Sequence, residues 1–296
     1  MRHPVFLMVF VNVCWGLSFL LSKHGMNVGF TPMSLALFRY IFAFLSLVLA
    51  VRLEKGKGKG MGRVEKRDIL PMILSGLMGI TLYYFFEYNG IQRTSTVDAS
   101  LILAAIPIMT MGADALLFRR RLGRVEVLGS LISLAGVGLV VLSGTDSGTA
   151  SLAGNLFVVA AGMVWVAYIF LCRDLRSRYD SLRMNMWQSL VGMATMIPLA
   201  LMEGGSLRAI PWDGWLAAIG LGAVCSALCY VLYGHAIRVL TPLQGSIFIN
   251  IIPLIAMGAG VAFLGETASW PSILGGGLIL LSILMINRQS RTAPAS

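Results

Sequence analysis

The sequence has little charge. Only 12% of its 296 residues are charged and 57% are hydrophobic, whereas a soluble domain carries roughly 25% charged residues. A soluble fold could not bury so much apolar surface, so the composition indicates an integral membrane protein. The sequence also lacks the alternating segments of about ten residues that are typical of a membrane β-barrel, which leaves membrane-spanning helices.

Cysteine and histidine are scarce as well. The four cysteines, Cys14, Cys172, Cys225 and Cys229, lie inside or at the edges of apolar runs, where they can pack as small apolar side chains. The three histidines are scattered elsewhere, so the sequence predicts neither a disulfide framework nor a metal site. A membrane enzyme would need a nucleophile or a convergent set of His, Cys or acidic side chains. No such set is present, and we expect no enzymatic activity.

Long apolar runs recur along the chain, each close to the roughly 20 residues that a helix needs to cross a hydrocarbon layer. The first run, in MRHPVFLMVFVNVCWGLSFLLS, lacks an obvious cleavage site of small residues, so we expect it to be retained as a span. The sequence predicts an all-α integral membrane protein with ten transmembrane helices. They are expected at Val5–Leu21, Met33–Val51, Ile69–Tyr88, Val97–Phe118, Val125–Leu142, Leu152–Cys172, Met184–Met202, Trp212–Leu232, Leu243–Leu264 and Trp270–Asn287.

Lysine and arginine are concentrated in alternate connections between the predicted spans. They gather in the second, fourth and sixth connections, at Arg238 and at both termini, whereas only Lys23, Arg93 and Arg208 fall on the other side. The positive-inside rule therefore predicts cytoplasmic N- and C-termini. The net charge of +10 indicates orientation in the bilayer, not nucleic-acid binding. The basic loop LEKGKGKGMGRVEKRD can also contact anionic lipid.

The second half of the chain repeats the first. A shift of 146 residues aligns ASLILAAIPIMTMGADALLF with GSIFINIIPLIAMGAGVAFL and places Pro107 on Pro253. A shift of 150 residues places Trp15 on Trp165. A pattern of this kind predicts a duplicated unit of five spans, with residues 1–146 as the first repeat and 147–296 as the second.

Five is an odd number, so the two predicted repeats must have opposite orientations in the membrane. Inverted repeats are a common architecture of secondary transporters. Two copies of one unit can exchange conformations across an axis in the membrane plane, which exposes a central site first to one side and then to the other. The architecture therefore predicts alternating access.

Three segments resemble the EamA-type ten-helix members of the drug/metabolite transporter superfamily, and the resemblance covers nearly the whole chain. They are CWGLSFLLSK, FFEYNGIQRTSTVDASLILAAIPIMT and HAIRVLTPLQGSIFINIIPLIAMGAGVAFLGETASWPSILGGGLILLSILMINR. The last is the most specific, with its proline, Leu264-Gly265-Glu266 and a Gly-rich final span. The first half departs from this pattern, because Arg119-Arg120 stands where the second half has Gly265-Glu266. The resemblance implies a carrier of the cytoplasmic (inner) membrane, most often an exporter of metabolites or amphiphilic compounds, without a bound cofactor.

Aromatic and polar residues recur at helical spacing in spans one and six, so two aromatic stripes would face each other across the pseudo-axis. Hydroxyl-bearing rings of neighbouring spans would complete a wall suited to an amphiphilic or aromatic solute. Ordinary helix packing or an aromatic belt at the membrane interface would give the same pattern. The predicted substrate-binding residues are Asn12, Trp15, Phe19, Tyr40, Tyr83, Tyr84, Glu87, Trp165, Tyr168, Tyr230 and Tyr233.

Two ionisable residues lie inside predicted spans. A charge at the centre of a bilayer costs about 2.5–3.5 kcal/mol on insertion scales, so a residue of this kind is expected to have a functional or structural role. Arg39 in span two and Glu87 in span three lie at compatible depths near the outer side. We expect Glu87 to take part in substrate or proton coupling and Arg39 to set its charge state. The alternative is that Glu87 is an interfacial acid that faces lipid headgroups. Asp114, one turn before Arg119-Arg120-Arg121, is expected to pair with those charges.

Pro107 and Pro253 fall inside spans four and nine at matched positions of the two repeats. A proline removes a backbone donor and can kink a helix. We expect these two residues to act as hinges, although prolines are also ordinary residues of membrane helices.

Together these features predict a secondary active transporter that works by alternating access. We expect a monomer that exports small amphiphilic metabolites such as amino acids or related amines across the cytoplasmic membrane, with protons as the candidate coupling ion. The alternative is a facilitative channel or uniporter for small polar solutes, because polar residues also line pores.

Overall fold

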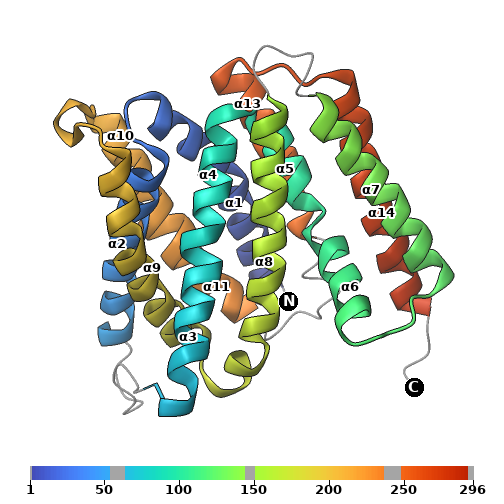
Figure 1. The fold of residues 1–296 in the computed structure, drawn as a ribbon, viewed down its shortest axis with the longest axis horizontal. Helices are drawn as coiled ribbons and strands as arrows, with labels where there is room; N and C mark the ends of the chain where they lie inside the picture. Colours follow the sequence, from blue (N-terminus) through green and yellow to red (C-terminus); the bar gives the residue numbers. More distant parts are fainter. Residues whose placement is uncertain (1, 54–63, 144–150, 237–247, 293–296) are drawn as a thin grey trace.

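A computed structural model describes residues 2–53, 64–143, 151–236 and 248–292 of the chain (Figure 1). Within these ranges all regular elements are helical. The α-helices are α1 (Arg2–Asn27), α2 (Pro32–Leu53), α3 (Ile69–Gly76), α4 (Tyr83–Arg93), α5 (Thr96–Ala104), α6 (Ile106–Leu117), α7 (Arg124–Ser143), α8 (Leu152–Arg178), α9 (Ser181–Glu203), α10 (Trp212–Ile219), α11 (Cys229–Ala236), α13 (Ile251–Leu264) and α14 (Trp270–Thr292). Two π-helical segments, η2 (Leu77–Leu82) and η4 (Gly220–Leu228), and two short 3₁₀ helices, η1 (Lys66–Asp68) and η3 (Leu207–Ala209), complete the set.

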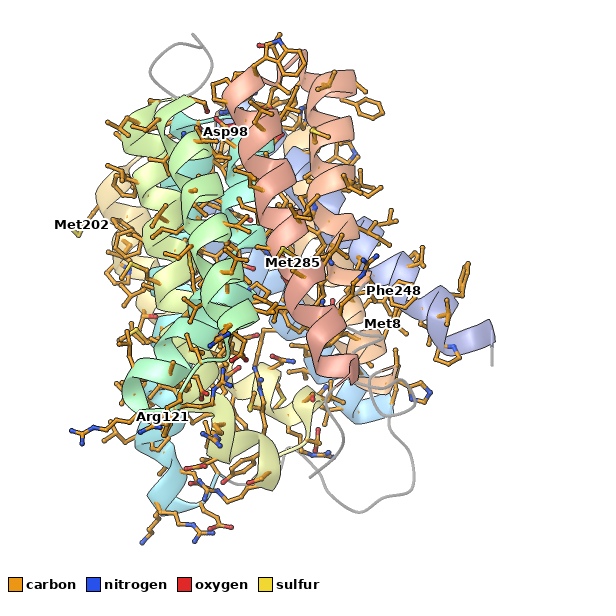
Figure 2. The ribbon with its side chains drawn as sticks, turned by 90° about the vertical axis from the view of Figure 1, so that its right-hand side faces the viewer. Met8, Asp98, Arg121, Met202, Phe248 and Met285 are labelled. Atoms are coloured by element: carbon orange, nitrogen blue, oxygen red, sulfur yellow. The ribbon has the colours of Figure 1, made fainter. Side chains whose placement is uncertain are left out.

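Eight helical segments of the described residues are long and apolar enough to cross a membrane, and α13 is a shorter apolar helix. Large apolar side chains stand on the outside of the bundle. Leu134 is 69% exposed and Phe263 74%. Met202, which is labelled at the edge of the bundle in Figure 2, is 83% exposed. An exterior of this kind is stable only where lipid covers it. The chain is therefore a multi-pass membrane protein. The eight segments are Pro4–Asn27, Pro32–Leu53, Lys66–Arg93, Thr96–Leu117, Arg124–Ser143, Leu152–Arg178, Trp212–Tyr233 and Trp270–Arg288.

The bundle is built from helices that pack in pairs. α7 lies along α14 at one side, α2 lies along α9 at the other, and α4 packs on α8 between them (Figure 1). Where α7 meets α14, a Cβ added to Gly136 would lie 2.6 Å from the carbonyl oxygen of Gly275. The two backbones therefore approach each other directly, as small residues allow in membrane helices.

The expectation of one continuous helix over Val97–Phe118 is wrong in detail. α5 ends at Ala104, Ala105 is a turn residue, and α6 begins at Ile106. Pro107 lacks an N–H group, and its ring would clash with the carbonyl group of the residue four positions earlier. The helix breaks just before the proline.

Span nine shows the same feature. The first residues of the predicted range Leu243–Leu264, numbers 243–247, lie outside the described residues. Asn250 is a turn residue, and α13 begins at Ile251, two residues before Pro253. Both predicted hinge prolines therefore follow a break in their helix.

Two further backbone features recur at aligned positions. The π-helical segments η2 and η4 end at Leu82 and Leu228, which the 146-residue shift places on each other. A π-helical segment inside an α-helix is rare and often marks a functional site. Arg119, after α6, has a φ of 52°, and the aligned Gly265, after α13, has a φ of 66°. Arginine thus occupies a left-handed position that glycine adopts more easily.

Candidate functional site

A cluster of tyrosines lies in the core of the bundle. Tyr83, Tyr84 and Tyr88 come from the first turns of α4, and Tyr40 comes from α2. The ring centroids are 4.9 Å apart for Tyr83 and Tyr84, 5.3 Å for Tyr84 and Tyr88, and 5.2 Å for Tyr40 and Tyr84, all edge to face. This is a preferred geometry of aromatic pairs. Three residues that were predicted to bind substrate, Tyr40, Tyr83 and Tyr84, therefore form one contact group with Tyr88.

Arg39 joins this cluster and is only 5% exposed. Its Nε donates to Ser226 Oγ at 2.7 Å, and its Nη1 donates to Tyr88 Oη at 2.9 Å. The guanidinium carbon lies 4.6 Å from the centroid of the Tyr84 ring. A buried cation needs hydrogen bonds and aromatic faces of this kind. Among the described residues it has no carboxylate within 4.0 Å, so Arg39 is directed to Ser226 and Tyr88 and not to Glu87.

Glu87 is buried in the same cluster, with an exposed fraction of 7%. Tyr83 Oη donates to Glu87 Oε1 at 3.1 Å. The other oxygen, Oε2, has no hydrogen-bond partner within the described part of the chain. An unpaired buried polar atom is costly and calls for an explanation. The burial places Glu87 in the interior, away from the surface that faces headgroups.

The two predicted aromatic stripes do not stack on each other but on tyrosines of the opposite half. The ring centroid of Trp15 in α1 lies 5.5 Å from that of Tyr230 and 5.3 Å from that of Tyr233, both in α11. Trp165 of α8 lies 4.7 Å from Tyr83 and 4.8 Å from Tyr168. Each tryptophan therefore contacts a helix of the other half of the chain.

A small cavity of about 20 Å³ adjoins these rings, which is room for about one water molecule. Gly79 of η2 allows Tyr168 to approach closely, because a side chain at this position would overlap the Tyr168 ring. The residues that line the cavity are Tyr40, Gly79, Ile80, Trp165, Tyr168, Asn185, Gln188, Ser189, Ser226 and Tyr230.

The polar face that α9 gives to this cavity was not predicted from the sequence. Asn185, Gln188 and Ser189 lie at helical spacing on α9, and Gln188 is 1% exposed. Gln188 Nε2 donates to Ser75 Oγ at 2.9 Å, and Tyr168 Oη donates to Gln188 Oε1 at 3.2 Å. The sequence did contain a signal for this face, because the three polar residues are spaced three and four positions apart inside an apolar run.

Two other predicted residues lie apart from the tyrosine cluster or at its edge. Asn12 is fully buried, and its Nδ2 donates to the carbonyl oxygen of Met8 in its own helix at 2.6 Å. Its Oδ1 lacks a hydrogen-bond partner in the described residues. Phe19 is 7% exposed and packs in the main hydrophobic core.

The family model of the EamA-like transporter family matches residues 3–142 and again residues 152–288. The chain belongs to the EamA-like transporter family. This EamA-like protein is therefore a transporter, not an enzyme.

Curated relatives have similar lengths. A probable terminal-alkyne amino-acid exporter of Streptantibioticus cattleyicolor is 24% identical over 291 residues, which cover 98% of this chain and 95% of that protein. An uncharacterized transporter of Archaeoglobus fulgidus is 28% identical over 264 residues, 89% of each chain. A protein of known crystal structure shares the fold, with a TM-score of 0.69 over 99% of both chains and 19% identity.

One end of this EamA-like transporter is held by charged side chains that cap helix ends. The Glu266 carboxylate accepts hydrogen bonds from Thr96 N at 2.9 Å, from Thr96 Oγ1 at 2.7 Å and from Val97 N at 3.3 Å. The two backbone N–H groups lie in the first turn of α5 and have no acceptor within the helix, so a negative charge is favourable there. Lys23 Nζ donates to carbonyl oxygens at the end of α4, to Ile91 at 2.6 Å and to Thr94 at 2.8 Å.

The first-half counterpart of Glu266 has a different role in this EamA-like transporter. Arg120 Nε lies 3.3 Å from Asp114 Oδ2, and Arg120 Nη1 lies 3.1 Å from Glu126 Oε1. The predicted pairing of Asp114 with the arginines after α6 is confirmed. The second-half Gly265-Glu266 dipeptide caps a helix, whereas the Arg119-Arg120 dipeptide of the first half forms surface ion pairs.

Proposed function

We propose that the protein is a secondary active carrier that exports small amphiphilic metabolites, such as amino acids or related amines, across the cytoplasmic membrane. It works as a monomer by alternating access, with ten spans in two inverted five-helix repeats, residues 1–146 and 147–296. Both termini are cytoplasmic. The observation that carries the proposal is the buried cluster of aromatic and polar side chains, with the unpaired oxygen of Glu87 among them.

Matched backbone features support the repeats. The two prolines that follow the helix breaks, Pro107 and Pro253, and the ends of η2 and η4 recur at positions related by the 146-residue shift. The family model also matches once in each half. The contacts of Trp15 with Tyr230 and of Trp165 with Tyr83 cross between the halves, as expected of two repeats that pack on each other.

The position of the basic connections supports the orientation. The α6–α7 and α8–α9 connections and the start of α3 lie at one end of the bundle, in the lower part of Figure 1. The start of α1 and the end of α14 also lie in the lower half of that view. The positive-inside rule assigns the end with the arginines to the cytoplasm.

Glu87 is the proposed coupling residue. Its Oε2 is free to accept a proton or an ammonium group, because Tyr83 donates only to Oε1. Arg39 makes its hydrogen bonds to Ser226 and Tyr88, so it does not hold Glu87 in an ion pair. Glu87 can then alternate between the protonated and the ionised form as the cluster opens to each side. Neutralising an acid inside a membrane protein lowers the cost of its burial, and proton relays of carriers use such acids.

Counterflow in proteoliposomes tests the proposal. The probe is the solute that most stabilises the purified protein in a screen of amino acids, amines and nucleosides. Vesicles are loaded with this unlabelled solute and diluted into a trace of labelled solute. A carrier produces a transient accumulation of label, because it exchanges a solute on one side for a solute on the other. Simple equilibration without accumulation would indicate a channel and contradict the proposal.

A further inference from the structure

A second, larger cavity opens between α6 and α8. Its volume is about 520 Å³, against about 20 Å³ for the cavity at the tyrosine cluster. Arg120 belongs to its wall, and its neighbour Arg121 lies near the opposite end of the bundle from Asp98 (Figure 2). The residues that line this α6–α8 cleft are Pro107, Thr110, Met111, Asp114, Arg120, Ile169, Phe170, Arg173 and Arg176.

Among the residues that the structure describes, two of the three arginines in the α6–α8 cleft have no acidic partner. Arg120 is paired with Asp114 and with Glu126. Within the described residues, neither Arg173 nor Arg176 has a carboxylate within 4.0 Å, and both are exposed. The cleft therefore presents two unneutralised guanidinium groups, each with several N–H donors.

Aromatic rings position both of these guanidinium groups. The Arg173 guanidinium carbon lies 5.2 Å from the centroid of Phe118, and that of Arg176 lies 5.9 Å from the centroid of Tyr168. A cation over a ring face is held by the ring quadrupole. Its N–H groups remain available in the guanidinium plane. A planar guanidinium matches the geometry of a carboxylate or a phosphate, which it can bind with two parallel hydrogen bonds.

The α6–α8 cleft adjoins the tyrosine cluster. Tyr168 has Arg176 over its ring and also lines the small cavity together with Trp165. Phe170, Met111 and Ile169 add an apolar wall beside the two arginines. The cleft therefore offers both charge and apolar surface to an anion with an apolar body. The side chain of Tyr168 lies between this cleft and the small cavity beside the tyrosine cluster.

We propose that the α6–α8 cleft is an access site that selects solutes bearing a carboxylate, and that Arg173 and Arg176 bind this group. This inference rests on the proposed function, because the orientation given there puts the cleft on the cytoplasmic side, where an exporter takes up its solute. It goes further in naming the recognised group. The chemistry also fits a lipid phosphate. The contact of Arg176 with Tyr168, which lines the inner cavity, favours the solute.

Binding of a matched pair of probes tests this assignment. The probes are 3-phenylpropanoate and its amide, 3-phenylpropanamide, which have nearly the same shape and differ in charge. Titration calorimetry uses the full-length protein in phosphatidylcholine nanodiscs. The carboxylate is expected to bind about tenfold more tightly than the amide, since a hydrogen bond to a charged group is lost with the amide. Equal binding of the two probes, or binding of neither, would overturn the assignment.

Variants test whether the preference for the carboxylate probe depends on Arg173 and Arg176. Arg173→Gln and Arg176→Gln are each expected to remove the preference for the carboxylate, and Arg176→Lys to retain only part of it, because lysine keeps the charge without the planar fork. Arg121→Gln is the matched control, since Arg121 is exposed and does not line the cleft. Loss of the preference in Arg121→Gln to the same extent would overturn the assignment, because a general loss of positive charge would then explain it.

A change of lipid separates the two anion sources. If the site takes a solute, the same titration in phosphatidylglycerol nanodiscs gives the same carboxylate preference. If phosphatidylglycerol abolishes the preference in the wild type, the arginines bind a lipid headgroup and the solute assignment is wrong.

The outcomes also separate this inference from the proposed function. Counterflow by the wild type, combined with an unchanged carboxylate preference in Arg173→Gln and Arg176→Gln, would contradict the access site but agree with the proposed carrier function. If these variants abolish the carboxylate preference but the wild type shows no counterflow, the anion site is supported and the carrier function is contradicted.

Discussion

At the scale of single residues, the polar contacts of the buried cluster converge on Arg39. It connects α2 with Ser226 of η4 and with Tyr88 of α4, and Tyr88 in turn accepts a hydrogen bond from Ser22 of α1 at 3.1 Å. Four separate segments thus depend on one side chain. Removing a partner from a buried charge leaves donors unsatisfied, which costs more than the hydrogen bond itself contributes.

Arg39→Lys is expected to destabilise the protein by about 1.5–3 kcal/mol, because an ammonium group cannot reach Ser226 and Tyr88 at once in the geometry of the guanidinium. The measurement is thermal unfolding in detergent. Arg93→Lys is the control, since Arg93 is exposed and its guanidinium group donates its hydrogen bonds among the described residues to Asn89 of its own helix. A shift of equal size in both variants would show that Arg39 has no special structural role.

The sequence predicted part of this site. Tyr83, Tyr84 and Tyr40 could be placed together because they lie on neighbouring apolar spans, and because Tyr84 aligns with a tyrosine of the other repeat. The partners of Arg39 could not be predicted. Ser226 is one of many serines in apolar runs, and the choice among them depends on the rotation of η4 against α2.

At the scale of elements, apolar runs predicted where the helices lie but not how their backbones deviate. An i to i+5 hydrogen-bonding pattern such as that of η2 or η4 leaves the hydropathy of a segment unchanged. Prolines gave a signal for the helix breaks, because their effect on the backbone is local. The close approach of α7 and α14 at Gly136 and Gly275 depends on side-chain volume, which only the packed structure reveals.

The hinge role of Pro107 and Pro253 predicts an effect on rate without loss of folding. Replacing either by Ala restores a backbone donor and lets the helix continue, so the protein is expected to remain as stable or become more stable while transport slows. Counterflow rates and unfolding temperatures measure the two effects. The control is Pro198→Ala, inside α9. Unchanged rates in both hinge variants would leave these prolines as ordinary packing residues.

The glycine contact between α7 and α14 predicts different responses from two nearby glycines. A Cβ at Gly275 would lie 2.5 Å from the carbonyl oxygen of Gly136, whereas a Cβ at Gly277 would meet nothing within 4 Å. Gly275→Ala is expected to destabilise the protein by about 1–3 kcal/mol through overpacking. Gly277→Ala should be neutral or stabilising by up to about 1 kcal/mol. Equal unfolding temperatures for the two variants would contradict the packing.

At the scale of the whole molecule, the distribution of charge predicts the topology. The end of α8 and the connection between α13 and α14 lie at opposite ends of the bundle (Figure 1). Ser177 belongs to the end of α8 and Thr267 to the connection, and both are exposed. In intact cells, a cysteine at position 177 should be protected from an impermeant thiol reagent, and one at position 267 should react. The reverse labelling pattern would invert the proposed orientation and the direction in which the α6–α8 cleft opens.

In the proposed mechanism, transport is coupled through Glu87. The most direct measurement is accumulation of the counterflow solute in proteoliposomes under a pH gradient, for the wild type, Glu87→Gln and Glu126→Gln. Glu126 is an acid in a surface ion pair and serves as the control. We expect gradient-driven accumulation by the wild type and by Glu126→Gln, and none by Glu87→Gln, at similar unfolding temperatures for all three. Accumulation by Glu87→Gln equal to that of the wild type would show that the coupling does not depend on this carboxylate.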